Sequence, residues 1–576
     1  MECEWIIAAP HPERERLSRE ARIDPLLAQI LLNRGVCSAT EARHFLKPEM
    51  SALLPPERLP GAVEAARRLA SAARDGRRIV IYGDYDVDGV TATAILWHAL
   101  TLAGANVDYY IPSRFDEGYG VNELALETLA ADGADLVVTV DCGITALEES
   151  RRARELGLEL IVTDHHEPRS ALPEAAVIVH PRALDERTSN PDLCGAGVAF
   201  KVAWALAQEL CAATRVTPEY RELLLDATAF AALGLVADVV PLVGENRVIA
   251  SFGLRWLCET RNPGLRALID VAGLAGKGKY NEYDVGFLLA PRLNAVGRLG
   301  HARLAVELFT RAGEQEAYEI ATTLDAQNRR RQSVERQIVK QAEEMVLARG
   351  FDRESCRGIV LASPDWHPGV IGIVASRIVD RFHRPTVLIA LGEGEGQGSG
   401  RSIRHFPLHE VLAACQQHLV SFGGHAMAAG LKIAADRVDA FTDAFSAEAA
   451  RRLTCADLVP KLHLDDEVAL SQLVPAAIEA IQRMAPFGIS NPRPRLATGL
   501  VELADEPRAV GQGGRHVQFT VRQQRTYRKA IAFGRGDRLQ ELADHRCLRL
   551  AFEPIINDWN GRRAVELKVI DWKLAE

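Results

Sequence analysis

The sequence predicts an α/β protein whose first half is built on a parallel β-sheet with helices on both faces. Short apolar runs rich in β-branched residues indicate buried strands, and stretches rich in helix formers lie between them. Strands that alternate with helices favour βαβ units, in which the strands run parallel. The strand-like runs are 79–81, 136–140 and 158–163, and the helix-like stretches lie near 90–103, 122–131 and 145–156.

Three aspartates follow the first predicted strand at alternate positions: Asp84, Asp86 and Asp88. Like charges this close repel and raise one another's pKa unless a cation lies between them. The same residue types also suit an acidic turn, and D-x-D-x-D occurs in calcium-binding loops. From this segment alone, a metal site and an acidic turn are both open.

Acids also follow the other two predicted strands. Asp141 comes directly after the second strand, and Asp164, His165 and His166 follow the third. Ligands of open parallel sheets bind outside the carboxyl ends of the strands, so these side chains are expected to converge. Asp238 is a further candidate because it ends a long apolar stretch, where a carboxylate is normally paired or metal-bound.

The types of ligand favour two metal ions. Several carboxylates with one or two imidazoles and no thiolate favour Mn²⁺ or Mg²⁺ over Zn²⁺ and copper. Five or more acids are too many for one ion. Two ions about 3.5–4 Å apart, bridged by a carboxylate, suit in-line hydrolysis of a phosphoester. One histidine of the adjacent pair can be a ligand, and the other can contact the phosphate or transfer a proton.

The sequence Asp164-His165-His166 is the signature of the DHH phosphoesterase superfamily. From about residue 50 to residue 576 the chain resembles the RecJ family, the single-strand-specific 5′→3′ DNA exonucleases of that superfamily. The joint order of many motifs carries the resemblance. They are YGDYDVDG (82–89), IPSRFDEGYG (111–120), TVDCGI (139–144), TDHHEP (163–168), CGAGVAFK (194–201), ALGLVADVVPL (232–242), APRLNAVGRL (290–299), DWHPGVIGIVASRI (365–378), GSGRSI (398–403) and FGGHAMAAGL (422–431).

The resemblance implies roles for individual residues. Asp141 would bridge the two ions and, with His166 at the scissile phosphate, would be catalytic. Asp84 is implied as a ligand or as an acid just behind the ligands. The other implied metal ligands are Asp86, Asp88, His165 and Asp238, and the residues implied to grip the nucleotide and its 5′ phosphate are Arg114, Arg292, His367, Ser399, Gly400 and Arg401.

Composition agrees with a large cytoplasmic enzyme. The length of 576 residues suggests about three or four domains. The net charge of −9 gives no global sign of nucleic-acid binding, but local patches can steer a polyanion. Ten cysteines without a C-x-x-C pair favour reduced thiols. The N-terminus lacks a basic leader, and the uncharged run 227–237 is far shorter than the ~20 residues that span a bilayer, so no membrane is expected.

The predicted domains follow breaks in the pattern. Residues 314–349 are charged, rich in helix formers and without proline, which predicts a helix about 54 Å long. Its Arg329–Arg331 could face phosphates or simply solvent. The predicted order is a helical extension (1–50), a DHH catalytic domain (51–300), a long connecting helix (301–350), a DHH-associated substrate-binding domain (351–458) and an OB-fold domain (459–576).

Glycine occupies every other position from Gly392 to Gly400, directly before Arg401. Glycines let backbone amides approach an anion, and Ser399 and Arg401 add donors. A loose surface hairpin is the alternative.

The last ~115 residues predict five strands, the number in an OB-fold. Residues 507–529 contain six basic residues and no acid, which favours a single-stranded nucleic acid. Phe519, Tyr527 and Trp559 are candidates for base stacking, although a core position suits Phe519 better. The strand-like runs lie near 495–504, 515–522, 526–533, 547–556 and 563–572.

The resemblance implies a metal-dependent exonuclease that degrades single-stranded DNA 5′→3′, releases 5′-mononucleotides and serves DNA repair and recombination. The alternative is a DHH phosphodiesterase for short oligonucleotides or cyclic dinucleotides, against which the C-terminal strands argue. A non-catalytic replication scaffold would have an eroded acid cluster, whereas every acid and both histidines are present. A single-strand-binding protein and a RecQ-like helicase are the implied protein partners.

Overall fold

The structure is a computed structural model that describes residues 3–114, 117–182, 190–299, 302–559 and 562–575. The chain forms two compact units. The smaller unit combines Met1–Ile6 with Ala326–His463, and the larger combines Ile7–Asp325 with Leu464–Glu576.

The larger unit contains the predicted parallel sheet. In spatial order its strands are β3 (Asn106–Tyr110), β2 (Arg78–Gly83), β4 (Leu136–Val140), β5 (Glu159–Thr163) and β6 (Val177–Val179). All neighbouring strands run parallel, and β2, β4 and β5 confirm the three predicted runs. The strands β3 and β6 were not predicted, because β3 is partly polar and β6 has only three residues.

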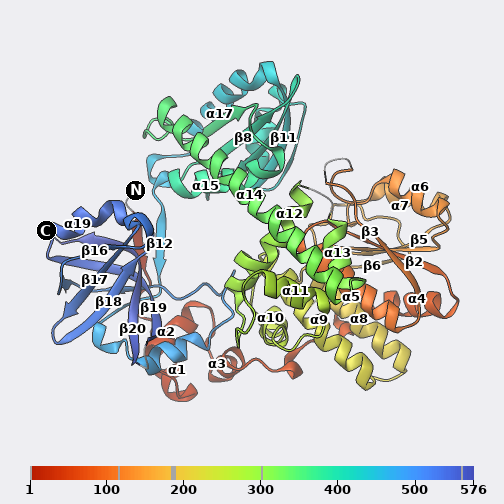
Figure 1. Cartoon of the computed structure of the whole chain (residues 1–576), viewed down its shortest axis with the longest axis horizontal. Helices are drawn as coiled ribbons and strands as arrows, with labels where there is room; N and C mark the ends of the chain where they lie inside the picture. The colour runs from red at the N-terminus through yellow and green to blue at the C-terminus, as the bar shows by residue number, and fades with distance from the viewer. Residues whose placement is uncertain (1–2, 115–116, 183–189, 300–301, 560–561, 576) are drawn as a thin grey trace. The chain divides into compact units, whose positions relative to one another are not determined.

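Helices cover both faces of this sheet (Figure 1). One face carries α4 (Ala62–Arg74), α5 (Val87–Leu102) and α8 (Gly195–Cys211), and the other carries α6 (Glu123–Ala131) and α7 (Leu147–Glu155). Alternate residues of β2 serve the two faces: Ile79 and Ile81 pack in one core cluster, and Val80 and Tyr82 in the other. This two-sided burial explains why the strand is apolar at nearly every position.

A helical layer follows the sheet along the chain. The long α9 packs against α5, α8 and α10. A six-residue π-helix, η3, runs directly into α12. The bounds are α9 (Pro218–Ala237), α10 (Gly244–Trp256), α11 (Pro263–Val271), η3 (Asp284–Leu289), α12 (Ala290–Leu299) and α13 (Arg303–Thr310).

The C-terminal domain, which belongs to the larger unit, is built from strands that pair in a closed ring. β15 (Val501–Leu503) pairs with β17 (His516–Gln523) and with β19 (Cys547–Trp559). β18 (Thr526–Ala532) joins β17 to β20 (Arg562–Leu574), and β20 pairs back to β19. Four of the five predicted runs are single strands, and the run 495–504 contains two short strands, β14 (Leu496–Thr498) and β15. The short strands β13 (Asp466–Val468) and β16 (Arg508–Val510) and the helices α18 (Pro475–Gln482) and α19 (Leu539–Ala543) complete the domain.

The N-terminal helices share a core with this C-terminal domain. They are α1 (Arg14–Ala21), α2 (Pro25–Asn33) and α3 (Ala39–Leu46). Leu17 and Leu26 lie in the same buried cluster as Phe552 and Trp572. The nearly buried ion pair of Arg34 with Asp465, 2.5 Å apart, adds a polar tie. The residues at the two ends of the sequence therefore form one folding module.

A buried arginine joins that module to the helical layer. Arg247 of α10 stacks over the Phe45 ring at 4.1 Å and donates to the Phe45 carbonyl at 2.9 Å. Its guanidinium also donates to the Met484 carbonyl at 2.6 Å and the Ala485 carbonyl at 2.9 Å. Burial lowers the pKa of Arg247 to about 10, so the group stays charged at neutral pH.

The smaller unit is a mixed sheet with flanking helices. Only the β7–β8 pair is parallel in its strand order, β10-β11-β9-β8-β7. The predicted 314–349 helix is present as α14, which crosses from one unit into the other, and the shorter α13 precedes it. The bounds are α14 (Glu314–Arg349), β7 (Ile359–Ser363), α15 (Pro368–Phe382), β8 (Thr386–Leu391), β9 (Glu395–Arg401), α16 (Leu408–Ala414), β10 (Ser421–Gly424), β11 (Ala428–Ala434) and α17 (Val438–Arg452), while β12 (Lys461–Leu464) pairs with β1 (Glu4–Ile7).

Most of the glycine-rich run before Arg401 is a strand inside this sheet, and the alternative of a loose hairpin is wrong. Residues 395–400 belong to β9, which lies between β8 and β11, and residues 392–394 form the turn that joins β8 to β9. A side chain at Gly398 would place its first carbon 2.6 Å from Leu431, and one at Gly396 would lie 2.8 Å from Ile389. Glycine is needed there because large apolar neighbours fill the space.

Within the part of the chain that the structure describes, none of the helices combines the length and the apolar character needed to cross a bilayer.

Candidate metal centre

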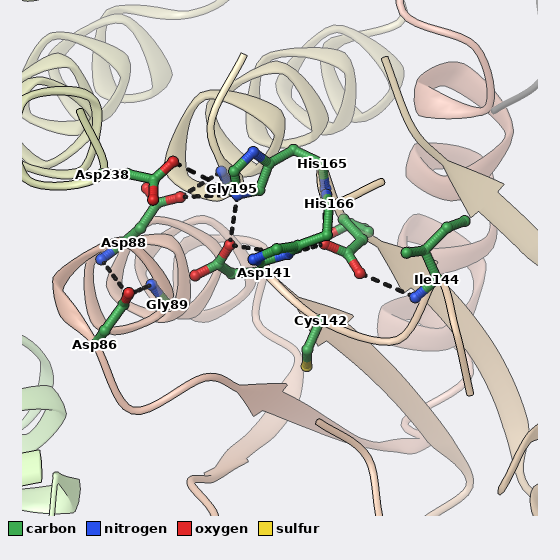
Figure 2. A network of polar contacts seen from close by, with 12 residues as sticks. Asp86, Asp88, Gly89, Asp141, Cys142, Ile144, His165, His166, Gly195 and Asp238 are labelled. Atoms are coloured by element: carbon green, nitrogen blue, oxygen red, sulfur yellow. Dashed lines mark hydrogen bonds and ion pairs between the residues drawn. The ribbon is translucent and has the colours of Figure 1, made fainter. Parts of the chain in front are cut away.

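The predicted acids and histidines converge at the carboxyl ends of the strands (Figure 2). Asp84 follows β2, Asp141 follows β4, and His165 and His166 follow β5. Asp238 comes from another direction, as the residue that ends helix α9. Asp86 and Asp88 lie at the start of α5. The predicted catalytic and metal-binding residues thus all lie around one point of the larger unit.

Three groups of side chains in this cluster could each hold a cation. In each group, one ligand atom per residue lies within 4.8 Å of the others. Asp141 and His165 link the groups, because each belongs to two of them. The groups are Asp84, Asp86 and Asp141; Asp141, His165 and His166; and Asp88, His165 and Asp238.

His165 lies at the centre of the cluster. Its Nε2 is 3.1 Å from Asp141 Oδ1, 3.7 Å from Asp238 Oδ2 and 3.8 Å from Asp88 Oδ2. Burial lowers the pKa of His165, which favours the neutral imidazole that a metal requires.

Buried atoms with no hydrogen bond indicate what the cluster accommodates. Asp84 Oδ1, Asp141 Oδ1 and His165 Nε2 are buried and make no hydrogen bond to any residue that the structure describes, and the 3.1 Å contact between the last two lacks the angle of a hydrogen bond. Buried polar atoms are otherwise almost always satisfied. The donor set, carboxylates with one imidazole, is the set that suits Mn²⁺ or Mg²⁺. The residues therefore fit divalent cations.

The charges of the cluster support the same conclusion. Burial, and then repulsion from Asp86, raises the pKa of Asp84 to about 8. Burial and the charge of Asp88 raise the pKa of Asp238 to about 8 and hold that of Asp141 well above its usual range. A cation between the carboxylates would reverse these shifts and keep the acids ionised.

Helix starts and glycines set the positions of the acids. Asp86 Oδ1 caps α5 by accepting from the Asp88 amide at 2.8 Å, and Asp88 accepts from the Gly195 and Ala196 amides at 2.5 and 2.9 Å. A side chain at Gly195 would place its first carbon 2.6 Å from Asp141 Oδ1. Positively polarised helix ends thus stabilise the acids, and glycine leaves room for them.

Two residues of the site have left-handed backbone conformations that side chains disfavour. Asp141 has φ of 63°, and Val239, directly after Asp238, has φ of 61°. Such conformations cost about 1–3 kcal/mol each and cluster at functional sites. The surrounding structure therefore has to stabilise a strained backbone at Asp141 and beside Asp238.

His166 is oriented by Asp164, a role that the sequence analysis missed. Asp164 Oδ1 lies 2.8 Å from His166 Nδ1, and Asp164 Oδ2 accepts from the Ile144 amide at 2.9 Å. Burial opposes both charges, but the bond between the two groups lowers the pKa of Asp164 to about 2 and raises that of His166 to about 9. The Tyr119 hydroxyl also lies 3.0 Å from His166 Nδ1. The available signal was the first letter of the Asp-His-His motif, which is Asp164 itself.

The two predicted arginines of the larger unit differ in their surroundings. Arg114 is exposed and lies 5.2 Å from the Tyr85 ring. It is also near enough to Asp84 that its positive charge offsets part of the rise in the pKa of that carboxyl. The Arg292 guanidinium is mostly buried and pairs with Asp325 at 2.9 Å. The structure therefore brings Arg114 to the acid cluster and holds Arg292 within its own helical layer.

The remaining predicted contacts gather at the start of α15 in the smaller unit. His367 caps that helix by accepting from the Gly369 amide at 3.0 Å. Arg401 donates to Ser399 Oγ at 3.1 Å and to the Gly400 carbonyl at 2.8 Å. A side chain at Gly372 of α15 would lie 2.8 Å from Ser399 Oγ and 3.1 Å from the Arg401 guanidinium. Arg401 and the Ser399 hydroxyl thus offer donors beside the first turns of a helix, a place that suits a phosphate.

The adjacent arginines Arg329–Arg331 of α14 are not equivalent. Arg331 is buried and pairs with Glu335 at 2.7 Å, so it does not face a phosphate backbone. Arg330 is exposed and close enough to His367 to contribute to the lowered pKa of that histidine, after burial. Arg330 therefore joins the group at the start of α15.

The C-terminal domain presents a groove of about 930 Å³ that includes Tyr527 and Lys529. Tyr527 is exposed, whereas Phe519 is a core residue, as expected. Arg522 is paired with Glu502 at 2.5 Å. The side chain of Trp559 lies outside the described residues.

Comparisons with known proteins identify the family of the chain. Three family profiles match: the DHH family N-terminal domain over residues 78–228, the DHHA1 domain over 357–451 and the RecJ OB domain over 464–571. The chain is 39% identical to the single-stranded-DNA-specific exonuclease RecJ of Bacillus subtilis, over 99% of this chain and 71% of the relative. It is 35% identical to RecJ of Escherichia coli, over 96% of both chains.

A solved structure shows the same fold. RecJ of Thermus thermophilus in complex with Mn²⁺ matches 100% of this chain and 80% of its own, with a TM-score of 0.84 and 33% identity. These similarities extend over all three matched domains. The chain belongs to the RecJ family of DHH proteins.

Proposed function

We propose that this protein is an exonuclease specific for single-stranded DNA, which hydrolyses phosphodiester bonds from the 5′ end and releases 5′-mononucleotides. The observation that carries the proposal is the acid cluster with its three buried, unsatisfied ligand atoms, in a chain that belongs to the RecJ family. The relatives are named as exonucleases specific for single-stranded DNA.

The cluster would hold two Mn²⁺ or Mg²⁺ ions, with Asp141 between them. When bound, two such ions supply activation of water and stabilisation of the charge that develops on the phosphodiester. We propose that the ligands come from the three groups of side chains that Asp141 and His165 link. Asp84 would be either a ligand or an acid directly behind the ligands. That set is Asp84, Asp86, Asp88, Asp141, His165 and Asp238.

His166 would contact the scissile phosphate. Its bond with Asp164 raises the pKa of His166 and favours the charged ring, and Asp164 fixes the ring by accepting from Nδ1. Its Nε2 can then donate to a phosphate oxygen. Exposed Arg114, which lies close to Asp84, offers a second donor.

The group at the start of α15 would bind the 5′ end of the strand. His367, Ser399, Gly400 and Arg401 gather there, and a terminal phosphate carries the charge that suits a helix start and an arginine. The C-terminal domain would retain the rest of the strand through its groove and Tyr527.

We also propose the domain division 1–50, 51–300, 301–350, 351–458 and 459–576. The matched RecJ OB domain disfavours an enzyme limited to short oligonucleotides or cyclic dinucleotides. We further propose that the protein acts in the cytoplasm, in DNA repair and recombination. A single-strand-binding protein and a RecQ-like helicase would supply its substrate.

End-blocked strands test the proposal. With Mn²⁺, the protein should degrade single strands with a free 5′ end and leave duplexes intact. Phosphorothioate linkages at the 5′ end should stop degradation, and the same linkages at the 3′ end should not. The opposite pattern would overturn the polarity, and cleavage limited to dinucleotides would restore the alternative enzyme.

A further inference from the structure

Two exposed aromatic rings stack on each other at the π-helix η3. The centroids of Tyr283 and Phe287 lie 4.8 Å apart with an angle of 24° between the rings. Tyr283 is 55% exposed and Phe287 is 63% exposed, in a chain where most large aromatic residues are buried or half-buried. Paired rings this open to solvent indicate a surface that something covers.

The segment that carries the rings is held rigidly from behind. Lys277 donates to both oxygens of the buried Asp284 at 2.6 Å. Asp284 in turn accepts from the Asn281 amide at 2.9 Å, and Asn281 accepts from the Asp284 amide at 3.0 Å. A π-helix is rare and occurs frequently at functional sites. The rings are thus fixed in place before any ligand binds.

This segment lies between the acid cluster and the C-terminal domain. Gly286, between the two rings in sequence, faces Val236 in the last turn of α9, the helix that ends at Asp238. On its other side, Glu282 pairs with Arg493 of the C-terminal domain at 2.6 Å. The segment therefore touches both the helix that leads to Asp238 and the domain proposed to retain the strand.

We propose that Tyr283 and Phe287 form a base-stacking platform for single-stranded DNA between the acid cluster and the C-terminal domain. The inference rests on the proposed function. Unpaired bases expose flat apolar faces that stack on aromatic side chains, whereas the bases of a duplex stack on one another. The platform would therefore favour single strands over duplexes as well as add affinity.

The neighbouring surface fits the same ligand. Val239, directly after Asp238, is 61% exposed, and Ile489 is 49% exposed. The Ile489 carbonyl accepts from the Leu242 amide at 3.0 Å, which holds these two loops side by side. The exposed apolar surface is thus not confined to the two rings.

Fluorescence of 2-aminopurine tests the platform directly, because stacking quenches this adenine analogue. A 5′-phosphorylated single strand would carry the analogue at one position at a time and be bound by the full-length protein without added metal, so that it is not cleaved. The wild-type protein should quench the analogue over one or two adjacent positions. The Tyr283→Ala/Phe287→Ala variant should remove that quenching, and Tyr283→Phe should retain it.

Affinity gives a second readout. Loss of each ring should raise the Kd for a long strand at least about fivefold. The slope of log Kd against log salt should stay unchanged, because no charge is removed. Leu102→Ala is the matched control, since this exposed apolar residue lies at the end of α5 opposite Asp86. It should leave both the Kd and the quenching unchanged.

The outcomes separate this inference from the proposed function. If the wild-type protein does not degrade single strands, the proposed function fails. If it does, but the double variant quenches and binds as the wild type does, the platform is wrong and the rings serve a protein contact. A changed salt slope would also overturn stacking as the cause.

Discussion

The acid cluster and the C-terminal domain hold their functional groups in opposite ways. In the cluster, three of the six proposed ligands are buried and the other three are half-buried, two residues have strained backbones, and Gly195 leaves no space beside Asp141. On the C-terminal domain, Tyr527 and Lys529 are exposed on a broad groove. Chemistry depends on a few atoms at fixed positions, whereas retention of a strand can be spread over many weak contacts.

The sharpest test of this difference is Asp141→Asn. The substitution keeps the volume and removes the charge of the residue shared by two of the candidate ligand groups. Hydrolysis should fall by more than about 100-fold, beyond the loss typical of groups behind the ligands. Turnover of a 5′-labelled strand with Mn²⁺ measures it. Exposed Asp132→Asn is the control and should be neutral.

The same pair of proteins tests metal binding without activity. Mn²⁺ should raise the Tm of the wild-type protein, because it relieves repulsion among buried carboxylates. The shift should be much smaller for Asp141→Asn. Equal shifts together with near-normal turnover would remove the two-metal site.

Gly195→Ala tests whether the cluster depends on spacing. The added carbon would lie 2.6 Å from Asp141 Oδ1, so the carboxylate has to move. We expect a loss of about 10–100-fold in turnover, like that of other groups that orient metal ligands. Gly313→Ala has nothing within 4 Å of the added carbon and should be neutral. Full activity of Gly195→Ala would show that the cluster is more tolerant than its packing indicates.

Truncation tests the other side of the comparison. Deleting 459–576 alone uncovers the apolar faces of α1–α3 and should aggregate, whereas residues 51–458 lack both halves of that module. The shorter protein should still cut a very short oligonucleotide. It should bind long strands more weakly, by about 1–3 kcal/mol per lost stacked base, with a shallower salt dependence. If the salt dependence of binding were equal for the full-length and the shortened protein, the module would have a structural role or would bind a protein partner.

Arg401→Ala should have the smallest effect on binding as a whole. Its loss should reduce use of 5′-phosphorylated ends by about 10–100-fold, because a charge-assisted contact to one terminal phosphate contributes about 1.5–3 kcal/mol. Binding of the same strand without the phosphate should change little. The ratio of turnover on the two strands measures this, and an unchanged ratio would place the 5′ phosphate elsewhere.

The sequence predicted the strands and helices whose formation depends on residues close to one another in the chain. Apolar β-branched runs identified β2, β4 and β5, because strands of a parallel sheet are buried on both faces. The partly polar β3 lacked that signal. The helix α14 has the predicted bounds because charged helix formers fill it without a proline.

Contacts between distant segments could not be predicted in this way. Nothing near Leu17 indicates that its partners lie near Phe552, more than 500 residues away. The burial of Arg292 against Asp325 likewise depends on how two helices meet. The glycine run before Arg401 was ambiguous because glycine serves both turns and crowded strands, and only the neighbours Leu431 and Ile389 decide between them.

The way Arg247 joins the helical layer to the terminal module has a consequence for how freely the two parts can change. Its hydrogen bonds go to main-chain carbonyls, those of Phe45 and of residues 483–486, and to no side chain there. The joint therefore recognises the path of the loop and not its residue types. The exposed side chain at Arg483 can be exchanged while the connection is kept, whereas Met484 is fully buried in the core of the module. A C-terminal domain grafted from another RecJ protein should therefore dock if its loop follows the same course.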